Sequence, residues 1–350
     1  MTKHSVCERT NINRAEQIFG FNPANSLALS SYWQSKEKCY KISEFNGFTM
    51  FEERKINMHD VVGTHDVVLI TLDTLRFDVA EHAFTQGKLP ALSRWLPSFG
   101  FERRHTPGSF TFAAHQAFLA GFLPTCAQPS VDGRAHPRLF ALAFPGSEST
   151  TENTYVFSHG ASLPQAFAHI GYRSICIGGV GFFNKCNPLG RVLPDLFEES
   201  YWHEDFGVTH PHSTDAQVAH ACEVLKQRSD RTKKLLAQSQ QRVFMLLNIS
   251  AIHQPNSHYM ADAQASRIDD VESHEAALCY VDQALAPLWD ALSVRGPALV
   301  IICSDHGTAY GEDGFFGHRN AHPVVMNVPY AHFVVPKNVV VPRNVVVPRT

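Results

Sequence analysis

The sequence predicts an α/β fold, with a mostly parallel central sheet covered by helices. Four short apolar runs rich in β-branched residues have the composition of buried strands, and segments with a helical pattern separate them. These runs are 65–73, 172–177, 243–248 and 298–303. Such alternation is typical of βαβ units, whose parallel strands direct their carboxyl ends to one edge of the sheet. Ligands bind at that edge in open α/β sheets, so we expect a functional site there.

The composition is that of an ordinary globular enzyme, because 44% of the 350 residues are hydrophobic and 18% are charged. A net charge of −3 provides no broad basic surface, so nucleic acid is not an expected partner. No apolar run reaches the ~20 residues that span a bilayer, so no membrane anchor is expected. The eight cysteines form no CxxC pair, which favours a reducing cytoplasm as the compartment.

The ends of the chain differ from the middle. Residues 1–60 contain one candidate helix, Asn13–Phe19, and are expected to form a partly disordered N-terminal extension. The main domain is expected to span 61–335, with short strands at Val324–Pro329 and His332–Val335. A tail follows at 336–350, where Asn-Val-Val-Val-Pro-Arg repeats and recurrent proline excludes a central strand.

The first apolar run, 65–73, ends in the carboxylate of Asp73. An aspartate after a strand often caps a following helix, and a ligand role is the alternative. The next helix is predicted at Ala113–Ala120, with Gly121 just after its end. Ser109 or Thr111 therefore lies at the N-terminus of this helix. Such a residue either caps the helix or acts as a nucleophile whose anionic partner faces free N–H groups.

The middle of the chain adds a helix–strand unit and two further helices. Ser162–Gly171 is predicted as a helix with proline in its first turn, and it leads into the strand 172–177. Long helices are predicted at Ala216–Gln238 and Asp270–Leu292. Between them, His253 follows the strand 243–248 and so lies at the expected ligand edge.

The last apolar run ends in Ser-Asp-His-Gly, which contains Asp305 and His306. A carboxylate oxygen beside an imidazole nitrogen suits a divalent cation such as zinc. Asp73 and Asp305 would meet at one sheet edge and repel each other unless a cation or a proton intervened. The alternative is an Asx-type turn with a solvated histidine. His318 follows in a glycine-rich loop.

The order of these motifs resembles the alkaline phosphatase/sulfatase superfamily over roughly residues 65–335. The resemblance implies a mixed, mostly parallel sheet sandwiched by helices, and a metal-dependent ester hydrolase or transferase. By this resemblance, Asp73, Asp305 and His306 match the metal ligands that the superfamily shares, and Thr111 matches its nucleophile, which also touches the metal. His253 and His318 match histidines that bind a second metal or the transferred group. The spacing from His306 to His318 is similar to that in the membrane-anchored phosphoethanolamine- and glycerophosphate-transferring branches.

One departure concerns the nucleophile. Sulfatases carry Cys-x-Pro-Ser-Arg there, whereas this chain has Thr111, Ala113, Ala114 and His115. A threonine cannot become formylglycine, which disfavours sulfate-ester hydrolysis. His115, one turn into the helix, either faces the site or packs in the core.

We therefore expect hydrolysis or transfer of a small phosphate ester, as a phosphodiesterase or a phosphotransferase, through a phosphothreonine on Thr111. The catalytic residues would be Thr111, His253 and His318. The metal ligands would be Asp73, Thr111, Asp305, His306 and His318. One divalent ion is expected, with zinc preferred over manganese, magnesium or calcium. A second ion is left open, since Asn248 stands where a second site usually has a carboxylate. The alternatives are a sulfatase and a catalytically silent metal- or ligand-binding relative.

Overall fold

The computed structural model describes residues 39–45, 48–54, 56–121, 141–144, 154–157, 162–234, 241–261 and 268–338. The chain consists of two compact units, Met1–Asn57 and Met58–Thr350. In the first unit, β1 (Cys39–Phe45) and β2 (Phe48–Arg54) pair as an antiparallel hairpin, which the sequence analysis did not predict. The candidate helix Asn13–Phe19 and the repeat beyond residue 338 lie outside the described residues.

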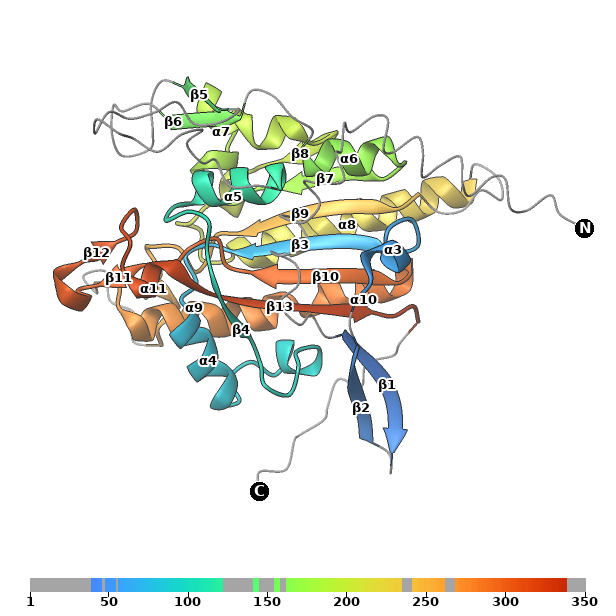
Figure 1. Cartoon of the computed structure of the whole chain (residues 1–350), viewed down its shortest axis with the longest axis horizontal. Helices are drawn as coiled ribbons and strands as arrows, with labels where there is room; N and C mark the ends of the chain where they lie inside the picture. The colour runs from blue at the N-terminus through green and yellow to red at the C-terminus, as the bar shows by residue number, and fades with distance from the viewer. Residues whose placement is uncertain are drawn as a thin grey trace, which may run out of the picture. The chain divides into compact units, whose positions relative to one another are not determined.

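A seven-stranded sheet forms the centre of the second unit, in the order β4-β13-β10-β3-β9-β7-β8 (Figure 1). Its strands are β3 (Asp66–Leu72), β4 (Glu102–His105), β7 (Arg173–Ile177), β8 (Glu199–Tyr201), β9 (Val243–Ile249), β10 (Ala298–Cys303) and β13 (Asn327–Val335). The strands from β10 to β8 pair in parallel, whereas β13 is antiparallel to both of its neighbours. The prediction of a mixed, mostly parallel sheet is confirmed.

Helices and small hairpins complete the unit. The helices are α3 (Met58–Val61), α4 (Phe77–Thr85), α5 (Thr111–Ala120), α6 (Leu163–His169), α7 (Pro188–Val192), α8 (Ser213–Lys234), α9 (Val271–Ala284), α10 (Ala286–Arg295) and α11 (Pro323–Met326). The two-stranded hairpins are β5 (Ala141–Phe144) with β6 (Thr154–Phe157), and β11 (Ala309–Tyr310) with β12 (Phe316–Gly317). No described helix has the length and apolar character needed to cross a bilayer.

Apolar side chains cover both faces of the sheet. On one face, α4, α8, α9 and α10 share a core with Ile70 of β3 and Met245 of β9. On the other face, Phe244 of β9 stacks on Phe167 of α6 at a ring distance of 4.6 Å. Alternate residues of a strand point to opposite faces, so β9 is buried throughout. This double burial explains why the central strands are unbroken apolar runs.

Three predicted elements need correction. Asp270–Leu292 is not one helix but two, because Pro287 lies in the first turn of α10 and cannot continue the hydrogen bonding of α9. The predicted strands Val324–Pro329 and His332–Val335 are parts of one strand, β13, which begins only at Asn327 because α11 occupies the residues before it. The long helix α8 begins at Ser213, three residues before its predicted start. The strands β4 and β8 were not predicted, because their sequences are mostly polar.

Candidate active site and metal centre

The candidate site forms where β3 and β10 end side by side. These two strands pair in parallel, with Cys303 opposite Thr71. Asp73 follows the end of β3, and Asp305 and His306 follow the end of β10. Strand register therefore brings Asp73 next to Asp305 and His306, which follow it by 232 and 233 positions in the sequence, at the carboxyl edge of the sheet.

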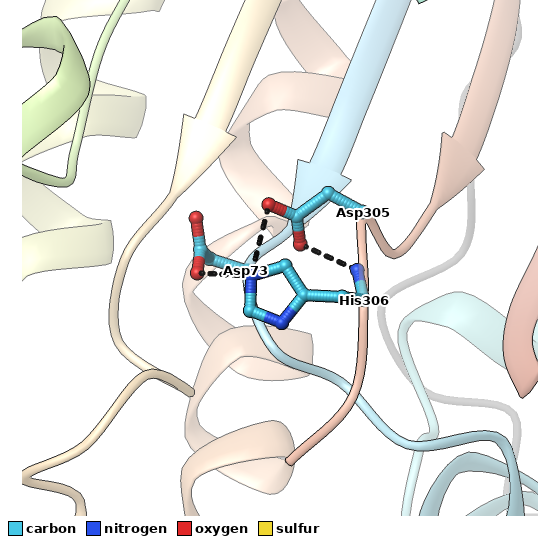
Figure 2. Close-up of side chains that lie close together, drawn as sticks. All are labelled: Asp73, Asp305 and His306. Carbon is cyan, nitrogen blue, oxygen red and sulfur yellow. Dashed lines mark hydrogen bonds and ion pairs between the residues drawn. The ribbon is translucent and has the colours of Figure 1, made fainter. Parts of the chain in front are cut away.

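The three side chains form a compact group of metal-ligand type. Asp73, Asp305 and His306 are fully buried, and one ligand atom of each lies within 4.8 Å of the others. Nε2 of His306 lies 3.9 Å from Oδ1 of Asp73 and 3.6 Å from Oδ2 of Asp305. Figure 2 shows both carboxylates converging on this nitrogen. Within the described ranges, no second group of three such residues meets the same distance criterion.

The electrostatics of this group call for a cation. Burial raises the pKa of both carboxyl groups to about 7, and the charge of Asp305 adds to the rise at Asp73. Burial lowers the pKa of His306 to about 4, so its ring is neutral at pH 7. Asp73 Oδ1 and Asp305 Oδ2 are buried and have no hydrogen-bond partner among the described residues. Two such oxygens beside a neutral imidazole fit a divalent cation.

Neighbouring backbone groups orient the side chains of Asp305 and His306. Asp305 Oδ1 accepts hydrogen bonds from the backbone N–H groups of Thr74 and His306, at 3.2 and 3.0 Å. Nδ1 of His306 lies 2.9 Å from the carbonyl oxygen of Gly307 and must donate to it. The lone pair of His306 is therefore on Nε2, the nitrogen that faces the two carboxylates.

The hydroxyl of Thr111 joins the group from helix α5. Its Oγ1 lies 3.3 Å from Oδ2 of Asp73 and 3.3 Å from Nε2 of His306. Thr111 is the first residue of α5, and the cap is Phe110, whose ring cannot accept a hydrogen bond. The cap interpretation of Thr111 is therefore wrong, whereas the predicted helix and its left-handed end at Gly121 are confirmed.

Two further predicted histidines lie next to His306. The ring of His318 is 4.7 Å from that of His306 and 5.7 Å from that of His253. Burial, followed by the charges of the other two histidines, strongly lowers the pKa of His318. Nδ1 of His318 is buried without a hydrogen-bond partner in the described part of the chain. The structure thus brings the predicted residues together, and the individual roles of His253 and His318 stay predictions.

Asn248 and His115 contact the carboxylates of the group. The side-chain amide of Asn248 donates to Asp73 Oδ2 at 3.1 Å, and its oxygen accepts from the N–H groups of Gly179 and Val180. Sequence reasoning noticed Asn248 only as a missing carboxylate; its place at the end of β9 was the available signal. His115 is fully buried, and its Nδ1 donates to the carbonyl oxygen of Thr111 at 2.8 Å. Nδ1 of His115 also lies 3.7 Å from Asp305 Oδ2, so the ring is packed in the core and contacts the site as well.

Solved structures with this fold provide the first comparison. The lipoteichoic acid synthase LtaP from Listeria monocytogenes superposes with a TM-score of 0.50 at 12% identity, over 77% of this chain and 65% of that one. The chain thus spans slightly less than two thirds of the length of LtaP. The C-terminal periplasmic domain of the phosphoethanolamine transferase EptC from Campylobacter jejuni gives 0.49 at 12% identity, over 79% and 81% of the two chains. The EptC domain from Escherichia coli, solved in complex with Zn, gives 0.49 at 13% identity, over 79% and 74%.

Sequence comparison identifies the family. No curated protein matches the chain. The family model described as Sulfatase matches residues 65–330. This range contains the strands β3 to β10 and all the residues of the candidate site, which are Asp73, Thr111, His253, Asp305, His306 and His318. This match covers most of the chain, and the protein therefore belongs to the sulfatase family of the alkaline phosphatase superfamily.

Proposed function

We propose that the protein is a metal-dependent hydrolase or transferase of small phosphate esters, with Thr111 as the nucleophile. The observation that carries the proposal is the position of the Thr111 hydroxyl, 3.3 Å from both Asp73 Oδ2 and His306 Nε2. The same hydroxyl lies at the N-terminus of α5, where free backbone N–H groups favour negative charge. A buried hydroxyl with proton acceptors on one side and N–H donors on the other suits nucleophilic catalysis.

Asp73, Asp305, His306 and the Thr111 hydroxyl would hold the cation, with His318 as a further ligand. When bound, a divalent cation would lower the pKa of a coordinated hydroxyl and stabilise negative charge on the transferred group. Carboxylate oxygens and imidazole nitrogen favour zinc, and manganese, magnesium and calcium are the alternatives. The two oxygens of Asp73 would have different tasks, since Oδ2 accepts from Asn248 and Oδ1 has no partner in the described chain.

In the first step, Thr111 Oγ1 forms a bond to phosphorus while the bond from phosphorus to the leaving oxygen breaks. The hydroxyl proton moves to Asp73 Oδ2, the carboxylate oxygen 3.3 Å away. His253 donates a proton to the leaving oxygen. His318 is assigned the other role, that of a neutral ligand, because its pKa is strongly lowered. The N–H groups at the start of α5 donate hydrogen bonds to the phosphoryl oxygens and stabilise the negative charge that develops there.

In the second step, the oxygen of a water molecule or an alcohol forms a bond to phosphorus while the bond from phosphorus to Thr111 Oγ1 breaks. The proton of the attacking oxygen moves to His253, and Thr111 Oγ1 recovers its proton from Asp73. Attack by water gives hydrolysis, whereas attack by an alcohol gives transfer. The sulfate-ester alternative would need direct attack of Thr111 on sulfur, because threonine cannot supply the formylglycine aldehyde. The non-enzyme alternative, a silent metal-binding relative, would keep the metal without any turnover.

The test compares wild type with the double variant Asp305→Ala/His306→Ala and with Thr111→Val. Metal content is measured beside turnover of an aryl phosphate diester, an aryl phosphate monoester and an aryl sulfate. We expect zinc in wild type, its loss from the double variant, and its retention in Thr111→Val without turnover. Thr214→Val is the matched control, because Thr214 is also a buried threonine near a helix N-terminus. It should keep both metal and turnover.

Each result separates the candidate functions. Turnover of a phosphate ester that Thr111→Val abolishes supports the proposal. Turnover of the sulfate alone would establish the sulfatase alternative, and a metal-loaded wild type inert toward all three esters would establish the silent one. Equal, negligible metal in wild type and in the double variant would overturn the metal centre itself.

A further inference from the structure

Arg319 follows His318 directly and is held against the start of helix α5. Its backbone N–H donates to the carbonyl oxygen of Ser109 at 2.8 Å. The guanidinium carbon lies 4.2 Å from the centre of the Phe110 ring. Phe110 is the residue immediately before Thr111. Two separate contacts thus fix this cation to the segment that presents the Thr111 hydroxyl.

The backbone at Arg319 is also unusual. Its φ angle is +69°, in the left-handed region that a residue with a Cβ atom rarely adopts. Such conformations persist where the surroundings impose them, and they cluster at ligand-binding sites. A glycine would adopt this angle without strain.

Arg319 lies beside the candidate site. It follows His318 directly, and the ring centre of His318 is 4.7 Å from that of His306. A second guanidinium at this edge of the sheet, that of Arg76, is bound by the carboxylates of Asp78 and Glu312. These ion pairs give Arg76 a structural role.

Charge balance indicates what Arg319 would bind. A divalent cation between Asp73 and Asp305 would be neutralised by the charges of those two carboxylates. The negative charge of an incoming phosphoryl group would then have no full counter-charge from these residues. A guanidinium offers a planar fork of N–H donors that matches phosphate oxygens.

We propose that Arg319 binds the non-bridging oxygens of the transferred phosphoryl group, held in position by its stacking on Phe110 and its backbone hydrogen bond to Ser109. The inference rests on the proposed function, because it names the residue that would receive the anion at that site. Arg319 forms hydrogen bonds to the group and takes part in no bond-making step.

Inorganic phosphate is the probe. Calorimetric titration of the zinc-loaded full chain compares wild type with Arg319→Gln, Arg319→Lys and Arg104→Gln. Arg104 is the matched control, because its guanidinium also stacks on an aromatic ring, 3.8 Å from the centre of Tyr330. Loss of charge-assisted hydrogen bonds should weaken phosphate binding by roughly 10- to 100-fold in Arg319→Gln. The phosphate affinity of Arg319→Lys should lie between those of wild type and Arg319→Gln, since lysine keeps the charge but lacks the planar fork of N–H donors. Arg104→Gln should bind as wild type does.

Zinc content and thermal unfolding of each variant are measured in the same samples. If Arg319→Gln does not fold, Arg319→Gly replaces it, because glycine relaxes the +69° angle. Unchanged phosphate affinity in the folded variant, or no phosphate binding by wild type, would overturn the proposal. Turnover of the aryl phosphate diester keeps the two proposals separate. Phosphate binding that depends on Arg319 without any turnover would reject the enzyme function alone. Turnover with unchanged KM and kcat in the variant would reject the role of Arg319 alone.

Discussion

His306 and Gly307 are joined by a hydrogen bond from the imidazole Nδ1 to the carbonyl oxygen of the next residue, at 2.9 Å. This short local contact decides which ring nitrogen carries the proton. With Nδ1 protonated, Nε2 presents its lone pair to the Thr111 hydroxyl and to both carboxylates. The nitrogen proposed to bind the metal and the carbonyl that orients its ring thus belong to two consecutive residues.

The first prediction is the tautomer of His306. Because burial lowers its pKa to about 4, the ring should be neutral and protonated on Nδ1 in the metal-free protein at pH 7. Long-range 1H–15N correlation spectra of histidine-labelled protein measure this, with His306→Gln identifying the resonance. Zinc should then shift the Nε2 signal while the Nδ1 proton stays. An imidazolium, or a ring protonated on Nε2, would contradict the prediction.

The second prediction concerns pH and the carboxylate of Asp305. Its pKa is raised by burial from 3.8 to about 7 in the folded protein. Between these values the folded state holds a proton that the unfolded state has released, so stability falls as pH rises. Metal-free Asp305→Asn lacks this titration. From pH 4 to 7, the free energy of unfolding of the variant should therefore rise relative to that of wild type, by up to about 1.4 kcal/mol per pH unit.

Denaturant titrations of both metal-free proteins at pH 4, 5.5, 7 and 8 measure that difference. The buried histidines titrate in both proteins, so their contributions largely cancel in the comparison. Saturating zinc should reverse the order at pH 8, because the cation stabilises only the protein that binds it well. A difference in stability that does not change with pH would rule out the raised pKa of Asp305.

The third prediction concerns Asn248, which fixes Asp73 Oδ2 from the neighbouring strand. Removing a partner that orients a metal ligand typically weakens metal affinity by roughly 10- to 100-fold, and we expect this for Asn248→Ala. Asn187→Ala is the control, because Asn187 also accepts a backbone N–H bond, as the cap of α7, and does not touch the ligands. It should cost about 1 kcal/mol of stability and leave zinc affinity unchanged. Equal zinc affinity in both variants would show that Asn248 does not orient Asp73.

The parts of the molecule that could be predicted share one property, a local signal. β3, β9 and β10 are apolar runs because both of their faces are buried, and Asp73 and Asp305 stand where those runs stop. β4, with the sequence Glu-Arg-Arg-His, is held in the sheet by pairing with β13, a long-range contact that leaves no apolar pattern. Local patterns cannot report such a strand.

The site divides in the same way. Thr111 and His306 were predictable, because each stands at the end of a predictable element. The hydrogen bond from Asn248 to Asp73 depends on strand register, and the stacking of Arg319 on Phe110 depends on how a loop meets a helix. Both join residues that are far apart in the sequence, so residue types alone could not indicate them.

The last prediction concerns Gly307, which turns the chain after Asp305 and His306. A Cβ atom there would collide with the backbone carbonyl of Val324, which cannot move independently of α11. Gly307→Ala should therefore cost roughly 3 kcal/mol or more of stability and also weaken zinc binding, because the Gly307 carbonyl orients His306. Gly314→Ala is the control. A Cβ atom at Gly314 would contact no other atom, but the φ angle there is +81°, which strains a residue with a side chain. Gly314→Ala should therefore cost about 1–2 kcal/mol of stability. Chemical unfolding and zinc titration measure both effects, and a Gly307→Ala protein as stable as Gly314→Ala would show that the loop and α11 are not in close contact.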